Sequence, residues 1–65
     1  MAKLERKFFR EWELSEKAYQ SYIDISFIFY LDADGIYYFA ECPKSKIERI
    51  GDIKQLESFL IAYSE

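Results

Sequence analysis

The first third of the chain combines a helix-favouring composition with a helical spacing of its larger side chains. Residues 1–22 contain no Val, Ile or Thr, and their absence favours a helix because β-branched side chains disfavour one. Six side chains, most of them large and apolar, follow one another at intervals of four, four, three, four and three residues, and this spacing places them on one face of a helix. This stripe consists of Leu4, Phe8, Trp12, Ser15, Tyr19 and Tyr22. We therefore predict an N-terminal helix.

Two features of this segment leave alternatives open. Phe9 and Leu14 are apolar but fall off the stripe. Ser15 is a good N-cap residue, so a fresh helix could begin there after a break in the chain. A second alternative makes residues 6–14, RKFFREWEL, a strand.

Residues 22–42 predict a β-hairpin. Between residues 22 and 31, Ile, Phe and Leu at odd positions alternate with Tyr, Asp, Ser and Ile at even positions. This period of two, with β-branched and aromatic residues, predicts a strand. Residues 32–35, Asp-Ala-Asp-Gly, have turn chemistry, because Asp favours the first position of a type I turn and Gly tolerates a positive φ. Residues 36–42 then return as the second strand.

The length of the hairpin loop decides which side chains share a face. A loop of two or four residues places the even-numbered residues 38–42 beside the odd-numbered residues 27–31. A loop of three residues, with Gly35 in a bulge, places the odd-numbered residues 37–41 there instead. We favour the first register, because it sets small side chains opposite large Phe residues and leaves Glu41 beside solvent.

In either register the second face of the hairpin is also apolar. In the favoured register it carries Ile28, Tyr30, Tyr37 and Phe39, and in the alternative Ile36 and Tyr38 replace the last two. One helix cannot cover both faces. Two helices on one face would leave an exposed aromatic patch, which is typical of an interaction site. Helices on opposite faces would instead make a three-layer sandwich.

The last third of the chain predicts a short strand and a helix. Pro43 ends the hairpin, because it cannot donate a ladder hydrogen bond. Residues 44–50 carry a weaker pattern for a third strand, and Gly51 gives a corner. Asp52 and Gln55 resemble a capping box, which predicts a helix from there to the C-terminus. Its inward stripe consists of Ile53, Leu56, Leu60 and Tyr63, with Phe59 beside it.

These elements define a small single α+β domain over residues 1–65, with a helix at each end and an antiparallel hairpin between them. A domain of 65 residues is marginal alone, because it buries only about 60% of its unfolded surface. One Trp, six Tyr and six Phe supply a large apolar surface, and self-association as a homodimer would supply more.

The sequence also limits the cellular compartment and the cysteine chemistry that we expect for this protein. It has no run of about 18 apolar residues and no apolar signal region at its start, so we expect a protein that neither spans a membrane nor is secreted. Cys42 is the only cysteine, which favours the cytoplasm and a reduced thiol. We expect this cysteine to be a small buried residue, because the chain has no His to activate it.

No enzyme activity, cofactor or metal is predicted. Without His, the chain lacks a usual zinc ligand, and with two glycines it lacks a phosphate-binding loop. Asp32, Asp34 and Gly35 do not have the spacing of a calcium loop. We expect both aspartates to be wet at the loop tip, with nothing to separate their pKa values.

The net charge of −3 is unevenly distributed. Residues 1–10 hold four basic residues against one acid, whereas residues 11–42 hold seven acids against one base. Acidic residues around an aromatic patch would steer the domain towards a partner with a basic surface. A solvated surface of mixed charge is the plainer interpretation of the same pattern.

We therefore predict a small, acidic, non-catalytic protein-interaction module that self-associates through the aromatic hairpin. We expect it to bind and modulate, for example inhibit, a partner protein. The expected contact residues are Ile28, Tyr30, Tyr37 and Phe39, and the expected steering residues are Asp24, Asp32, Asp34 and Glu41. A purely structural role for these aromatic residues, in the core or in a homodimer, is the competing interpretation.

Single-stranded nucleic acid is the alternative partner. Sheet aromatics that stack on bases, with basic residues at the rim, are typical of such binders. The basic contacts would be Lys3, Arg6, Lys7 and Arg10. The acidic residues of the hairpin argue against it, because phosphate attraction supplies most non-specific affinity.

Overall fold

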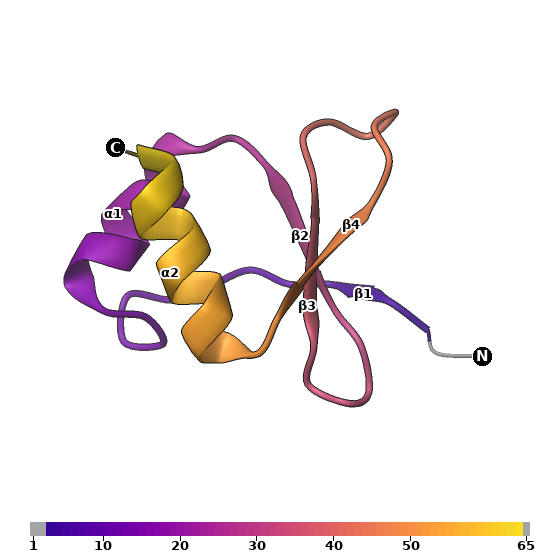
Figure 1. Ribbon diagram of the computed structural model, residues 1–65, viewed down its shortest axis with the longest axis horizontal. Coiled ribbons are helices and arrows are strands. Elements are labelled where there is room, and N and C mark those ends of the chain that lie inside the picture. The colour runs from indigo at the N-terminus through magenta and orange to yellow at the C-terminus, as the bar shows by residue number, and fades with distance from the viewer. Residues whose placement is uncertain (1–2, 65) are drawn as a thin grey trace.

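An antiparallel sheet and two helices make up the fold (Figure 1). The computed structural model describes residues 3–64, and in that part of the chain the strands lie in the order β1-β2-β3-β4. The elements are β1 (Glu5–Arg6), α1 (Glu16–Asp24), β2 (Ile28–Leu31), β3 (Tyr37–Ala40), β4 (Glu48–Gly51) and α2 (Ile53–Ser64). The predicted α+β class, the hairpin, the third strand after it and the final helix are confirmed.

The first helix is shorter than predicted, and a strand precedes it. Helix α1 begins at Glu16, so the predicted helix over residues 1–22 is wrong for the described residues before that point. Strand β1 pairs with β2 instead, and the Lys7 backbone N–H donates to the Phe29 carbonyl at 2.8 Å. The alternative of a strand over residues 6–14 is therefore right only where the segment begins.

Burial explains why the helix prediction fails here. Phe9 and Leu14, which fall off the helical stripe, are only 5% and 7% exposed. Phe8 and Trp12, which lie on the stripe, are 64% and 73% exposed. An extended chain alternates its side chains, so it can bury Phe9 while Phe8 points away. Packing of these two residues overrides the local helix propensity.

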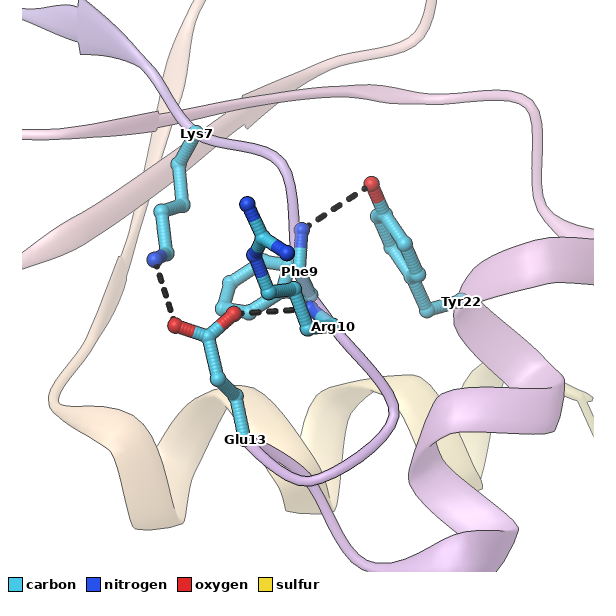
Figure 2. Close-up of polar contacts among 5 residues, drawn as sticks. All are labelled: Lys7, Phe9, Arg10, Glu13 and Tyr22. Atoms are coloured by element: carbon cyan, nitrogen blue, oxygen red, sulfur yellow. Dashed lines mark hydrogen bonds and ion pairs between the residues drawn. The ribbon is translucent and has the colours of Figure 1, made fainter.

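A tight turn between Arg10 and Glu13 carries the chain from β1 towards α1 (Figure 2). The Glu13 carboxylate accepts from the Lys7 ammonium at 2.9 Å and from the Arg10 backbone N–H at 2.7 Å (Figure 2). These hydrogen bonds, that of Lys7 above all, hold the pKa of Glu13 below its usual range. The Tyr22 hydroxyl accepts from the Phe9 backbone N–H at 3.3 Å, which ties the segment to α1 (Figure 2).

Helix α1 begins with the Ser15 cap that the sequence offered as an alternative. The Ser15 hydroxyl accepts from the Ala18 backbone N–H at 3.3 Å, and the Ser15 backbone N–H donates to the Glu57 carboxylate of α2 at 2.7 Å. The second helix thus anchors the start of the first. Because α1 runs to Asp24, the predicted strand over residues 22–31 loses its first residues to the helix.

Helix α2 begins with the predicted capping box. The Gln55 backbone N–H donates to the Asp52 carboxylate at 2.9 Å, and the Asp52 backbone N–H donates to the Gln55 side-chain oxygen at 3.0 Å. Leu56 and Leu60 on the inward face are fully buried, whereas the two ends of the predicted stripe are exposed. Neither helix between residues 3 and 64 is long and apolar enough to cross a bilayer.

The hairpin has a loop of three residues. Phe29 pairs directly with Phe39, and the Asp32 backbone N–H donates to the Ile36 carbonyl at 3.1 Å. This leaves three residues as the loop, the last of which is Gly35 with φ 83°. The favoured loop of two or four residues is therefore wrong, and the three-residue alternative is confirmed.

Both helices pack on the same face of the sheet (Figure 1). On this covered face the Phe29 ring lies 6.0 Å from the Phe9 ring and 5.5 Å from the Tyr22 ring, measured between centroids. The Phe39 ring lies 4.7 Å from the Phe59 ring of α2. The buried core consists of Phe9, Leu14, Ala18, Phe29, Leu56 and Leu60. No helix in residues 3–64 covers the opposite face, which we call the open face.

Candidate binding surface on the open face of the sheet

One residue from each strand forms a row across the open face. The strand register pairs Arg6 with Tyr30, Tyr30 with Tyr38, and Tyr38 with Arg49. Directly opposed residues point to the same face. Because neighbouring strands lie about 4.8 Å apart, the row is roughly 14 Å long. The two arginines are exposed and the two tyrosines are half-buried. We call these four residues the Arg–Tyr row.

An apolar strip lies beside the Arg–Tyr row. Ile28 of β2 pairs with Ala40 of β3. The backbone hydrogen bond made by Lys7 extends the β1–β2 register, which sets Phe8 next to Ile28. The β3–β4 register, continued by one residue, sets Ile47 next to Ala40. Phe8 and Ile47 are 64% and 41% exposed, so both ends of the strip present apolar surface to solvent.

The four residues predicted to share one contact surface are divided between the two faces. Ile28 and Tyr30 lie on the open face. Tyr37 and Phe39 lie on the covered face. The centroid of the Tyr37 ring is 5.5 Å from that of the buried Phe9 ring, and the centroid of the Phe39 ring is 4.7 Å from that of the half-buried Phe59 ring. The three-residue loop causes this division, because a shift of one residue in register exchanges the faces of a strand. Tyr38 occupies the place expected for Tyr37 and Phe39.

All three arginines of the chain lie beside aromatic residues. The Arg6 guanidinium lies 4.8 Å from the centroid of the Phe8 ring, and the Arg10 guanidinium lies 5.4 Å from that of Trp12. Arg49 stands opposite a tyrosine of the Arg–Tyr row. An arginine over an exposed ring contributes about 0.5–1 kcal/mol and keeps its N–H donors available to a partner.

The structure separates the four basic residues predicted as nucleic-acid contacts. Arg6 belongs to the Arg–Tyr row, and Arg10 lies at the turn before α1. The Lys7 ammonium pairs with Glu13 and lies 5.3 Å from the centroid of a core phenylalanine ring. Lys3 is exposed near the start of the described chain. These four residues therefore do not form one basic cluster on the open face.

Asp32 is an acid of the open face, and it is only 8% exposed. Its carboxylate accepts from the backbone N–H groups of Asp34 at 2.9 Å and Ile36 at 3.0 Å, and from the Tyr38 hydroxyl at 3.0 Å. These bonds, that of Ile36 first, lower the pKa of Asp32, and Arg49 adds to the effect. The Tyr38 pKa is raised, chiefly by its bond to Asp32.

The expectation that both loop aspartates are wet and equivalent is therefore wrong for Asp32. Its oxygens are occupied by hydrogen bonds that hold the hairpin loop and orient Tyr38. Asp34 is exposed at the tip of the loop. Asp32 is thus a structural acceptor that fixes the middle of the Arg–Tyr row.

The other predicted steering acids come from different parts of the fold. Asp24 ends helix α1, which packs on the covered face. Glu41 follows β3 in the next turn, and Asp34 lies in the hairpin loop. All three are exposed, but they do not come from the strands that form the Arg–Tyr row.

Cys42 is exposed, so the prediction of a buried cysteine is wrong. It lies in a turn after β3, where its Sγ is 3.0 Å from the Ser45 Oγ and its carbonyl accepts from the Ser45 N–H at 2.9 Å. The Ser45 hydroxyl, followed by the Lys44 backbone N–H, lowers the pKa of this thiol. An exposed thiol of this kind reacts faster with alkylating agents than a buried one. The sequence signal for the exposure of Cys42 was the run of turn-forming residues that begins at Pro43.

Within residues 3–64, no three His, Cys, Asp or Glu side chains come together as metal ligands. Comparison of the chain with protein-family models, curated proteins and solved structures found no match. Function is therefore inferred from the geometry of the open face.

Proposed function

We propose that this chain is a non-catalytic protein-interaction module, which binds another protein through the open face and modulates it. One observation carries the proposal: both helices pack on one face of the sheet, and the other face presents the Arg–Tyr row and the apolar strip. Tyrosine and arginine are among the residues that dominate protein interfaces. An apolar face left open normally marks an interaction site.

The separation of the open face from the core supports this proposal. The buried cluster and the partly buried residues packed against it do not include Ile28, Tyr30 or Tyr38. Among the described residues, no ring contact or side-chain hydrogen bond involves Tyr30. A partner would bury this side chain, which the fold itself leaves half-exposed.

A different protein is a better occupant of the open face than a second copy of the chain. Any two-fold axis that lays one Arg–Tyr row on another sets arginine against arginine and tyrosine against tyrosine. Like charges opposed in this way disfavour the homodimer. We therefore propose a heterologous partner and no stable homodimer through this face.

The simplest mode of modulation is occlusion, in which the rigid sheet covers part of the partner's functional surface. Strand residues hold the Arg–Tyr row in place, so little order has to be gained on binding. We place this interaction in the cytoplasm, where a reducing environment would keep the exposed Cys42 as a free thiol.

Single-stranded nucleic acid is the second candidate partner, and the Arg–Tyr row itself favours it. Tyr30 could stack on a base while Arg6 and Arg49 contact phosphates. The net charge of −3 opposes it, because a nucleic acid would bring many phosphates against a chain that is acidic overall. We rank it below protein binding for this reason.

The test places a photo-crosslinking amino acid, p-benzoylphenylalanine, at position 30 in one variant and at position 54 in another. Tyr30 lies on the open face, whereas Lys54 is exposed on α2 and serves as the matched control. After irradiation in extract of the cells that express the chain, we expect a protein adduct from position 30 and none from position 54. Excess unmodified chain should compete for the partner and abolish the adduct. Excess Tyr30→Ser chain should reduce the yield of the adduct less.

Each other outcome contradicts the proposal in a recognisable way. An adduct that nuclease removes and protease leaves would assign the face to nucleic acid. Equal adducts from both positions, or an adduct that the Tyr30→Ser chain competes as well as the unmodified chain does, would mean that the open face is not the binding surface. No adduct from position 30 would also refute the proposal.

A further inference from the structure

The open face has a charge pattern that the overall charge of the chain hides. The chain carries −3, yet two of its three arginines, Arg6 and Arg49, form the two ends of the Arg–Tyr row. Both are exposed. They are separated by the two tyrosines, so the face presents a positive charge, an aromatic centre and a second positive charge in line.

The acid on this face does not cancel that pattern. Asp32 is 8% exposed, and its two oxygens accept three hydrogen bonds from the loop and from Tyr38. It lies near Arg49, which favours its ionised form. Arg6, at the other end of the row, makes no ion pair with another described residue and lies over the Phe8 ring.

We infer that the partner segment which covers the open face is extended and carries two acidic side chains, four residues apart, with an apolar side chain midway between them. This inference rests on the proposed function and specifies its partner. A guanidinium forms paired hydrogen bonds with a carboxylate, so each end of the row would take one acid. The apolar side chain would lie on Tyr30 and Tyr38.

The spacing follows from the geometry of the row. Residues i and i+4 of an extended chain point to the same side and lie about 13 Å apart. The Arg–Tyr row spans roughly 14 Å across the sheet, so the two distances match. Residue i+2 points to the same side and falls over the tyrosines. This inference replaces the sequence-based expectation of a basic partner, because three of the four acids on which that expectation depended lie elsewhere in the fold.

A long polyanion fits the face less well than such a segment. Nucleic acid would bring many charges against a chain that is acidic overall, including those away from the arginines. A segment with two acids brings its charges only to the ends of the row. The nucleic-acid arm of the test below decides between these two occupants.

The test titrates the ¹⁵N-labelled chain with three probes and follows its backbone amide shifts. The first probe is a short peptide with the pattern Glu-Ser-Leu-Ser-Glu, and the second is its matched Lys-Ser-Leu-Ser-Lys counterpart. The third is a single-stranded oligothymidylate. We expect the acidic peptide to bind more tightly than the basic one and to shift the amides of Tyr30, Tyr38 and their neighbours in β1 and β4.

Two charge-reversed variants make the test specific. Arg6→Glu changes an exposed end of the row, and Lys54→Glu makes the same change of charge on α2. We expect Arg6→Glu to weaken binding of the acidic peptide by about twofold to thirtyfold, because it removes one exposed ion pair and adds one repulsion. Lys54→Glu should leave the affinity nearly unchanged. A dispersed amide spectrum confirms that each variant is folded.

Several results would overturn the inference. These are equal or tighter binding of the basic peptide, an effect of Lys54→Glu as large as that of Arg6→Glu, shifts confined to the helices, or no shift with either peptide. Tighter binding of oligothymidylate than of the acidic peptide would assign the face to nucleic acid instead. A protein adduct from position 30 would still support the proposed function if the acidic peptide failed.

Discussion

Truncation of two residues that the sequence places on one surface should have very different effects on stability. Phe39 lies on the covered face, with its ring 5.4 Å from the Phe27 ring and 4.7 Å from the Phe59 ring. Phe→Ala in a full core costs about 3–5 kcal/mol, so for a half-buried ring we expect a loss of about 2–3 kcal/mol. Tyr30 lies on the open face without ring contacts among the described residues, so Tyr30→Ala should cost about 1 kcal/mol or less.

Urea unfolding, followed by far-ultraviolet circular dichroism, measures both losses. A small domain has an m value of about 1 kcal/mol per molar urea, so Phe39→Ala should lower the midpoint by roughly 2–3 M. Tyr30→Ala should lower it by about 1 M or less. A domain of this size has a total stability of roughly 3–10 kcal/mol, so the Phe39 variant should lose a large fraction of it.

Tyr30→Phe serves as the control, because it keeps the ring and removes only the hydroxyl. It should leave the midpoint nearly unchanged. Equal losses for Tyr30→Ala and Phe39→Ala, or a larger loss for Tyr30→Ala, would refute the assignment of faces. The side chain of Tyr30 would then belong to the core, and the open face would not be free to bind a partner.

Three further predictions concern the parts of the fold that support this face. Gly51→Ala should lower the free energy of unfolding by about 1–3 kcal/mol in urea, because φ is 136° and a Cβ would collide with the Gln55 side chain; an unchanged midpoint would contradict this. Ser15→Ala should cost about 1 kcal/mol in the same assay through loss of the helix cap, and Ser15→Asp should restore most of it. The lowered pKa of Asp32 stabilises the fold fully above the ordinary aspartate pKa of about 3.9, and this contribution is lost as pH falls from there through the folded-state pKa. Unfolding in urea across an acid pH series should show this loss, and Asp32→Asn should flatten the pH dependence in that range; an unflattened profile would mean that another carboxylate is responsible.

Local chemistry is sufficient where a few neighbouring residues determine the backbone. Asp32 to Gly35 form the predicted turn, and Asp52 with Gln55 forms the predicted capping box. In both places the determining hydrogen bonds join residues two to four apart. Local chemistry is insufficient before Ser15, where helix-favouring residues form a short strand and a turn. Burial of side chains against distant parts of the chain decides the structure there, and the amino-acid composition of the segment does not predict that burial.

The candidate site was predictable only in part, because it also depends on how distant parts of the chain pair with one another. Tyr30 and Ile28 follow from the alternation of β2, whichever register the hairpin adopts. The choice between Tyr38 and Phe39 depends on a difference of one residue in loop length, and the sequence permits both lengths. Arg49 becomes a neighbour of Tyr38 only through pairing with β4, whose pattern in the sequence is weak. A residue whose role depends on such pairing has no local signal.

Sedimentation equilibrium over micromolar to millimolar concentrations tests most directly whether the open face is free for another molecule. We predict the mass of a single chain throughout this range, at low and at high salt. A stable dimer that Tyr30→Ser dissociates, and that the matched Lys54→Ser variant leaves intact, would contradict this prediction. The open face would then be occupied by a second copy of the chain, and the partner-binding surface would have to lie elsewhere.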